Sequence, residues 1–250
     1  MAEKLEITGR LREGEKTVLF IPGGMASAPA VYDGIGEMIP WQSAVIDWSN
    51  SKGPWDILEL GNRTLDLIRQ MNLGKVILAG YSAGGVIAMQ AAAEDKEGRI
   101  GGLLLSNTGP CTIGHGDPEL PERIRKQWFS MELFEPFLNR CFAFPIEPLL
   151  KKTMIEYASK IPMEVVYQAA KTLREYDLRP RLKEISCPVV IAHGKLDTTR
   201  TLKHVEMMQE GIADVEINLL NGGHTIMAED REHWVLILNK LIQKVERAME

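Results

Sequence analysis

Gly80-Tyr81-Ser82-Ala83-Gly84 lies between an apolar run at residues 75–79 and an alanine-rich segment at residues 83–94. The run is typical of a buried strand, and the segment is typical of a helix that packs closely on a sheet. A strand, a G-x-S-x-G turn and a helix form a tight bend that raises the serine hydroxyl clear of the sheet. The helix N-terminus at this point favours a developing negative charge. The pattern therefore predicts Ser82 as a nucleophile.

Short apolar runs alternate with amphipathic segments on both sides of this bend, which predicts βαβ units on a mostly parallel sheet. Strands are expected at residues 4–8 (an edge strand), 17–21, 44–48, 75–79, 100–106, 188–192 and 215–220. Helices are expected at residues 54–72, 83–94 and 230–250, the first with Pro54 in its opening turn. The sequence thus predicts an α/β fold in which helices flank a central sheet.

Residues 111–179 interrupt this alternation. The segment has no clear strand, prolines punctuate it, and it contains five of the six phenylalanines of the chain. We expect several short helices that form a cap inserted after the strand at residues 100–106. Residues 1–110 and 180–250 then make up the core domain.

A serine hydroxyl needs a base to take its proton and a third group to orient that base. Histidine suits the role of base because its pKa lies near neutral pH. His224 follows the last predicted strand, at the carboxyl edge where open α/β sheets bind their ligands. The other histidines are His204 and His233 inside predicted helices, His193 as a turn residue at a strand end, and His115 as a reserve candidate near the start of the cap.

Asp197 is the predicted acid. It stands in the loop after the strand at residues 188–192, so the three residues follow the chain order Ser, Asp, His. The competing interpretation is that Asp197 only caps a helix that begins near Thr199. Asp117 and Asp214 are less well placed.

An oxyanion hole needs two N–H donors aimed at the oxygen of the tetrahedral intermediate. The backbone N–H of Ala83, directly after the serine, is the first expected donor. The loop Pro22-Gly23-Gly24-Met25 is expected to supply the other, with Gly24 as first choice and Met25 as second. The alternative is that the two glycines only form a turn and supply no donor.

The bulk composition excludes some classes of partner. The formal net charge of −5 does not suit a protein that neutralises phosphates, so nucleic acid is not an expected partner. The three cysteines have neither metal-ligand nor redox-motif spacing, which predicts reduced thiols in a cytoplasmic protein and no metal site. The polar N-terminus and the lack of an apolar run of about 18 residues predict neither secretion nor membrane spanning.

The chain resembles the α/β-hydrolase superfamily, and within it the small cap-bearing esterases and lactonases that include the 3-oxoadipate enol-lactonases. The resemblance is carried by Phe20-Ile21-Pro22-Gly23-Gly24, Gly80 to Gly85, Tyr176-Asp177-Leu178-Arg179-Pro180, Gly194 to Asp197 and Gly223-His224. One departure is Pro22-Gly23, where the family often has His-Gly. A serine nucleophile argues against the haloalkane dehalogenases and epoxide hydrolases of this fold.

The resemblance implies hydrolysis of a small or medium carboxylic ester or lactone through an acyl-enzyme on Ser82, without a cofactor. A carbon–carbon bond hydrolase acting on a diketone, a thioesterase, and a non-catalytic ligand-binding protein of the same fold are the alternatives. The expected partner is a small-molecule substrate, and a homodimer is left open.

Aromatic residues predict an apolar substrate pocket beside Ser82. Its expected lining includes Tyr81 from the bend, and Trp128, Phe129 and Phe134 from the cap. The alternative for the phenylalanines is that they form the core of the cap itself.

Overall fold

A seven-stranded sheet runs through the computed structural model, which describes residues 4–113 and 117–250. The strand order is β1-β3-β2-β4-β5-β6-β7. The strands are β1 (Ile7–Thr8), β2 (Thr17–Ile21), β3 (Gln42–Ile46), β4 (Val76–Tyr81), β5 (Ile100–Ser106), β6 (Val189–Gly194) and β7 (Val215–Leu220). Only β1 pairs antiparallel among these strands, so the predicted mostly parallel sheet is confirmed.

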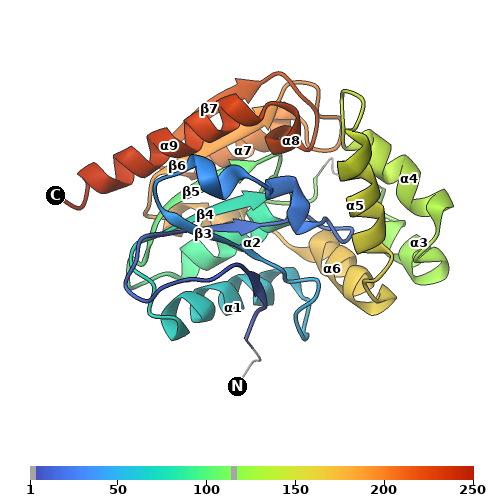
Figure 1. Cartoon of the computed structure of the whole chain (residues 1–250), viewed down its shortest axis with the longest axis horizontal. Coiled ribbons are helices and arrows are strands. Elements are labelled where there is room, and N and C mark those ends of the chain that lie inside the picture. Colours follow the sequence, from blue (N-terminus) through green and yellow to red (C-terminus); the bar gives the residue numbers. More distant parts are fainter. Residues whose placement is uncertain (1–3, 114–116) are drawn as a thin grey trace.

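Helices cover both faces of the sheet (Figure 1). On one face α1 (Ile57–Gln70) packs against α2 (Ala83–Glu94), and α9 (Arg231–Arg247) lies across the other face. The remaining elements outside the cap region are α7 (Leu202–Gly211), α8 (Ile226–Glu229) and the 3-10 helices η1 (Pro29–Tyr32), η2 (Ile35–Met38) and η3 (Arg179–Glu184). Because both faces are covered, every residue of β2, β4 and β6 is buried, which explains their continuous apolar runs.

Several predicted boundaries differ from the observed ones. Strand β3 ends at Ile46 because the chain turns at Asp47, whose carbonyl accepts the N–H of Asn50 at 3.2 Å. Helix α1 begins only after Asp56, whose side chain accepts the N–H groups of Leu58 and Glu59. The predicted place of Pro54 in the first turn of that helix was therefore wrong. The predicted last helix at residues 230–250 is observed as α9, and a short helix that was not predicted, α8, precedes it.

Between β5 and β6, where the sequence predicts an inserted helical segment, the described residues form four α-helices. They are α3 (Leu120–Gln127), α4 (Met131–Arg140), α5 (Pro148–Ala158) and α6 (Met163–Glu175), and we call them the cap helices. Figure 1 shows them gathered on one side of the molecule, beyond the ends of the strands. The division into a core domain and a cap domain stays a prediction.

The two ends of the cap segment meet beside the sheet. The N–H of Leu178 donates to the carbonyl of Pro110 at 2.7 Å, and Cys111 forms an isolated antiparallel bridge with Asp177. The chain therefore leaves the sheet and returns to it at the same place.

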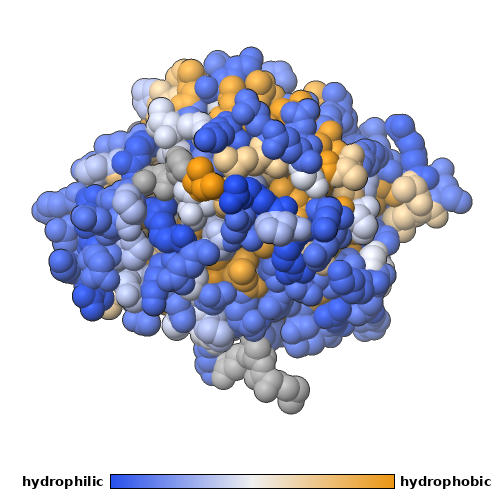
Figure 2. Space-filling view, turned by 180° about the vertical axis from the view of Figure 1, so that it is seen from behind, coloured by the Kyte–Doolittle hydropathy of each residue, from blue (hydrophilic) through white to orange (hydrophobic). Residues whose placement is uncertain are grey.

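The face seen from behind is mostly hydrophilic, with hydrophobic residues in small groups between the polar ones (Figure 2). In residues 4–113 and 117–250, we find no helix with the length and apolar character needed to cross a membrane. Cys111, Cys141 and Cys187 are all buried, and none of them forms a disulfide in this structure.

Candidate active site

Ser82 occupies a strained turn between β4 and α2, with φ of 54° and ψ of −117°. Its glycine neighbours have no room for a side chain: a Cβ on Gly84 would lie 2.0 Å from the carbonyl oxygen of Ile21, and one on Gly80 would lie 2.4 Å from that of Gly84. The Ser82 N–H donates to the carbonyl of Ser106 at 2.9 Å. These close approaches explain why the turn carries glycine on both sides of the serine.

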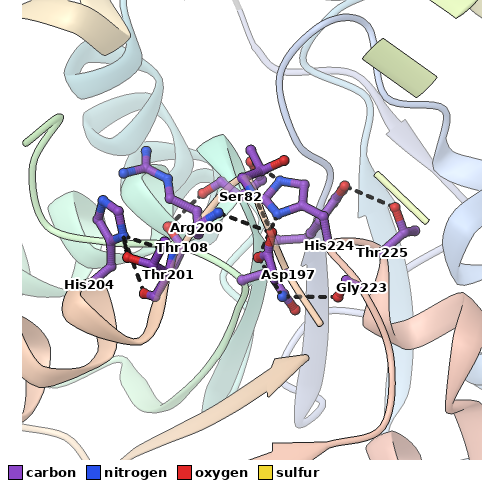
Figure 3. Close-up of polar contacts among 12 residues, drawn as sticks. Ser82, Thr108, Asp197, Arg200, Thr201, His204, Gly223, His224 and Thr225 are labelled. Carbon is purple, nitrogen blue, oxygen red and sulfur yellow. Dashed lines mark hydrogen bonds and ion pairs between the residues drawn. The ribbon is translucent and has the colours of Figure 1, made fainter. Parts of the chain in front are cut away.

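Three side chains that are distant in sequence meet at this turn (Figure 3). His224 Nε2 lies 3.0 Å from Ser82 Oγ, and His224 Nδ1 lies 2.8 Å from Asp197 Oδ2. Asp197 follows β6 and His224 follows β7, so the carboxyl ends of the strands bring them together. Both side chains are almost completely shielded from solvent. The geometry fits the predicted order of nucleophile, base and acid, although the catalytic roles themselves stay predictions.

The carboxylate of Asp197 accepts further hydrogen bonds. Asn107 Nδ2 donates to Oδ2 at 2.7 Å, and the N–H groups of Thr199 and Arg200 donate to Oδ1 at 2.7 and 3.0 Å. Asp197 thus caps the turn at Thr199 and also contacts His224, so the two interpretations of this residue are compatible. Burial raises the pKa of Asp197, but the His224 charge and the hydrogen bonds outweigh it and bring the pKa to about 2. The group is therefore a carboxylate at neutral pH.

The other histidines take different positions. His193 lies inside β6 and is buried, so its prediction as a turn residue was wrong. His204 is buried in α7, where its Nδ1 accepts the N–H of Thr201 at 3.1 Å. His233 pairs with Asp230 at an exposed position of α9, and His115 lies outside the described residues. Of the described histidines, His224 is the one that is hydrogen-bonded to Ser82.

The loop after β2 also lies close to the serine, since a Cβ on Gly23 would lie 3.2 Å from the Cβ of Ser82. A Cβ on Gly24 would lie 3.6 Å from the Cβ of Ala83, and Gly24, Met25 and Ala83 all line the pocket beside Ser82. Trp48 Nε1 donates to the carbonyl of Pro22 at 3.1 Å. The indole of Trp48 therefore braces this loop. The roles of Gly24, Met25 and Ala83 as oxyanion donors stay predictions.

A pocket opens above Ser82, with an empty volume of about 900 Å³ when its mouth is included. Its lining is mostly apolar, and the cap helices supply much of it. Phe134, Phe137 and Leu138 come from α4, Met154 comes from α5, and Ala169, Ala170 and Leu173 come from α6. Tyr81 and Phe134 also line this pocket, and its role in substrate binding stays a prediction.

Trp128 and Phe129 are not among the described residues that line this pocket. The ring of Trp128 packs edge-on against Phe129 and Phe134, with centroids 5.4 and 5.8 Å apart, and its Nε1 donates to the carbonyl of Ile161. Both residues are partly buried and pack against the hydrophobic core. The prediction that they line the pocket was wrong, because their rings are occupied by aromatic packing behind Phe134.

Sequence reasoning did not find Asn107, Thr225 or Glu229. Asn107 directly follows β5 and donates to Asp197 and also to the carbonyl of Gly223 at 3.1 Å. It could have been found by examining every polar residue that follows a predicted strand. Thr225 Oγ1 lies 3.1 Å from the hydroxyl of Tyr81, and Glu229 accepts the backbone N–H groups of Gly223 and Ala143.

The arrangement can perform nucleophilic chemistry with side chains alone. Within the described part of the chain, no group of three or more His, Cys, Asp or Glu side chains is placed to hold a metal ion. The expectation that no metal or cofactor takes part stays a prediction.

Comparison with known proteins shows the family of the chain. The model of the family described as "Alpha/beta hydrolase family" matches residues 18–236. The chain is 26% identical to the AB hydrolase superfamily protein YisY of Bacillus subtilis over 74% of each chain. It is 22% identical to 3-oxoadipate enol-lactonase 1 of Acinetobacter baylyi, covering 78% of this chain and 76% of the lactonase.

Solved structures share the fold. The crystal structure of the enol-lactonase from Burkholderia xenovorans LB400 superposes with a TM-score of 0.83 over 95% of each chain, at 19% identity. The family model spans most of the chain, including the turn at Ser82, Asp197 and His224. This protein therefore belongs to the alpha/beta hydrolase family.

Proposed function

We propose that this protein hydrolyses a small or medium carboxylic ester or lactone through an acyl-enzyme on Ser82. The observation that carries the proposal is the pair of short contacts, 3.0 Å from Ser82 Oγ to His224 Nε2 and 2.8 Å from His224 Nδ1 to Asp197 Oδ2. Ser82 also lines the mostly apolar pocket. The expected partner is therefore a small molecule with an apolar acyl part.

The first half of the reaction acylates the serine. His224 Nε2 accepts the proton of Ser82 Oγ while the oxygen attacks the carbonyl carbon of the substrate. The Asp197 carboxylate stabilises the imidazolium that forms, and the N–H groups of Gly24 and Ala83 donate to the oxyanion. His224 then returns the proton to the departing alkoxide, which remains attached to the acyl group when the substrate is a lactone.

The second half releases the acid. Water gives a proton to His224 Nε2 and attacks the ester carbonyl on Ser82, and collapse of the tetrahedral intermediate restores the serine hydroxyl. The same base and the same oxyanion donors serve both halves. The likeness to enol-lactonases supports an ester or lactone carbonyl as the electrophile.

The first experiment treats the protein with a fluorophosphonate probe and identifies the labelled residue by peptide mass spectrometry. We expect one label, on Ser82, and no label in the Ser82→Ala variant, whose fold is checked by circular dichroism. Absence of a label on the folded native protein would overturn the proposal and favour a non-catalytic ligand-binding protein.

A substrate panel then tests the bond that is cleaved. Aryl esters and lactones with acyl groups of increasing length are compared with acyl thioesters and with a vinylogous diketone. We expect the highest kcat/KM on an ester or a lactone. A higher value on the thioesters or the diketone would contradict the proposed substrate class and leave Ser82 as nucleophile.

A further inference from the structure

Glu229, the last residue of α8, accepts three backbone hydrogen bonds from two separate parts of the chain. Its Oε2 accepts the N–H of Gly223 at 2.7 Å. Its Oε1 accepts the N–H groups of Ala143 and Phe144 at 2.7 and 2.9 Å. One carboxylate therefore joins the residue before His224 to the turn that follows α4.

A second connection lies on the other side of His224. The N–H of Thr225 donates to the carbonyl of Cys141 at 2.9 Å. A Cβ placed on Gly223 would lie 2.7 Å from the nitrogen of Ala143, so the two segments are in direct contact. Both neighbours of His224 are thus tied to residues 141–144.

Residues 141–144 continue directly from α4, the cap helix that presents Phe134, Phe137 and Leu138 to the pocket. A substrate that packs against α4 therefore contacts a helix whose following residues, 141–144, are hydrogen-bonded to the loop of His224. Hydrogen bonds from N–H groups to a carboxylate are about twice as strong as bonds between neutral groups, so this connection is stiff.

We propose that Glu229 is a positioning residue that fixes the loop of His224 relative to α4, so that Nε2 stays within reach of Ser82 while the pocket is filled. Glu229 does not line the pocket and acts through the backbone of Gly223. The inference rests on the proposed function, because it assigns His224 the role of base.

The variant Glu229→Gln tests the proposal. The amide keeps one acceptor oxygen but turns an NH₂ group toward the N–H of Gly223 or toward those of residues 143 and 144, so one side of the connection is lost. We expect kcat for an ester and the fluorophosphonate labelling rate to fall about 10- to 100-fold, because small displacements of a reacting group cost that much. KM should change by less than about threefold, since no substrate contact is removed.

Glu147→Gln is the matched control. The carboxylate of Glu147 also accepts two backbone N–H groups, those of Leu149 and Leu150 at 2.9 and 2.7 Å, but these bonds stay within the cap helices. The control should retain the labelling rate of the native protein. It therefore separates the loss of a capping carboxylate from the loss of the connection to His224.

Proton NMR gives a readout that general loosening of the fold would not mimic. The proton between His224 Nδ1 and Asp197 should give a low-field resonance in the native protein and in Glu147→Gln. In Glu229→Gln we expect this resonance to shift or broaden while the thermal midpoint stays above the assay temperature. If Glu229→Gln does not fold, Glu229→Asp replaces it, because its shorter carboxylate cannot span both partners.

The outcomes are distinct. A folded Glu229 variant with the labelling rate and the low-field resonance of the native protein overturns the positioning role and leaves the proposed function intact. A native protein that is not labelled overturns the proposed function itself. A slow variant with an altered resonance beside an unchanged Glu147→Gln supports the inference.

Discussion

At the scale of the residue, Asp197 shows how one carboxylate is held in a single orientation. Hydrogen bonds to Oδ1 come from the backbone of Thr199 and Arg200, and those to Oδ2 come from His224 and Asn107. Each oxygen therefore faces only donors. An amide at this position would direct two hydrogens toward other hydrogens whichever way it turned.

We expect Asp197→Asn to lower kcat/KM for an ester by about 10⁴-fold, because an amide does not stabilise the imidazolium and favours the wrong tautomer of His224. Initial rates on an activated aryl ester measure this loss. Asp214→Asn is the matched control, since Asp214 pairs with Lys244 at the surface. Comparable activity of the Asp197 and Asp214 variants would remove Asp197 from the role of acid.

The sequence predicts Ser82, Asp197 and His224 because each follows a recognisable strand, and parallel strands end at one edge. It does not predict Glu229, whose partners include the backbone of residues 143 and 144 and depend on the path of the cap. It also misplaces Trp128 and Phe129, because composition does not distinguish a ring that faces substrate from one that packs against Phe134. Side chains that bind backbone from another segment leave no local pattern.

At the scale of the element, α7 begins with a capping pair formed by Thr201 and His204. The N–H of Thr201 donates to His204 Nδ1, which requires that nitrogen to be without a proton. Burial, followed by the neighbouring charge of Arg200, lowers the pKa of His204 to about 4. The start of this helix therefore depends on a neutral histidine.

The sign of the resulting pH dependence follows from linkage. The pKa of His204 is lower in the folded than in the unfolded protein, so the full stability is present above pH 6.5 and declines as the pH falls toward about 4. We expect the native protein to lose more free energy of unfolding between pH 7 and pH 4.5 than His204→Gln does. Urea denaturation at a series of pH values measures the difference.

His233→Gln is the control for the loss of a histidine, because His233 lies at an exposed position of α9. Its stability should follow that of the native protein across the same pH range. Parallel curves for the native protein and His204→Gln would show that His204 is not held neutral by the fold.

Element limits were predicted correctly where the residue pattern is distinct and were missed where it is not. The limits of β2, β5, β7 and α2 agree with the sequence, since apolar runs and the small-residue helix mark them. Strand β3 begins earlier, at Gln42, because Gln42 and Ser43 pair with β2 although they are polar. The backbone pairing with β2, rather than the polarity of the side chains, therefore sets the start of β3.

At the scale of the whole molecule, hydrogen bonds fasten the cap helices to the remainder of the chain. The hydroxyl of Tyr157 on α5 donates to Asp47, just after β3. Gln168 and Thr172 on α6 accept the N–H groups of Trp55 and Ile57 at 2.7 and 3.1 Å. Burial, and then the hydrogen bond to Asp47, raise the pKa of Tyr157, so its hydroxyl remains a donor at any ordinary pH.

We expect Tyr157→Phe to lower the free energy of unfolding by about 1–3 kcal/mol, because the half-buried carboxylate of Asp47 loses a hydrogen-bond donor. The cap helices should also be cleaved faster by protease, with α5 and its flanking turns as the first sites. Limited proteolysis and denaturant titration measure the two effects. Tyr167→Phe on α6 is the control, and equal behaviour of the two variants would contradict a fastening role for Tyr157.

The meeting of the two ends of the cap segment has an evolutionary consequence. Pro110 and Leu178 are hydrogen-bonded neighbours, so the whole excursion from residue 111 to residue 177 is a loop with closed ends. A segment whose two ends lie together can be lengthened, shortened or exchanged without moving the strands that flank it. Ser82, Asp197 and His224 all lie outside this segment. Exchange of the segment during evolution would therefore change the lining of the pocket while these three residues are kept.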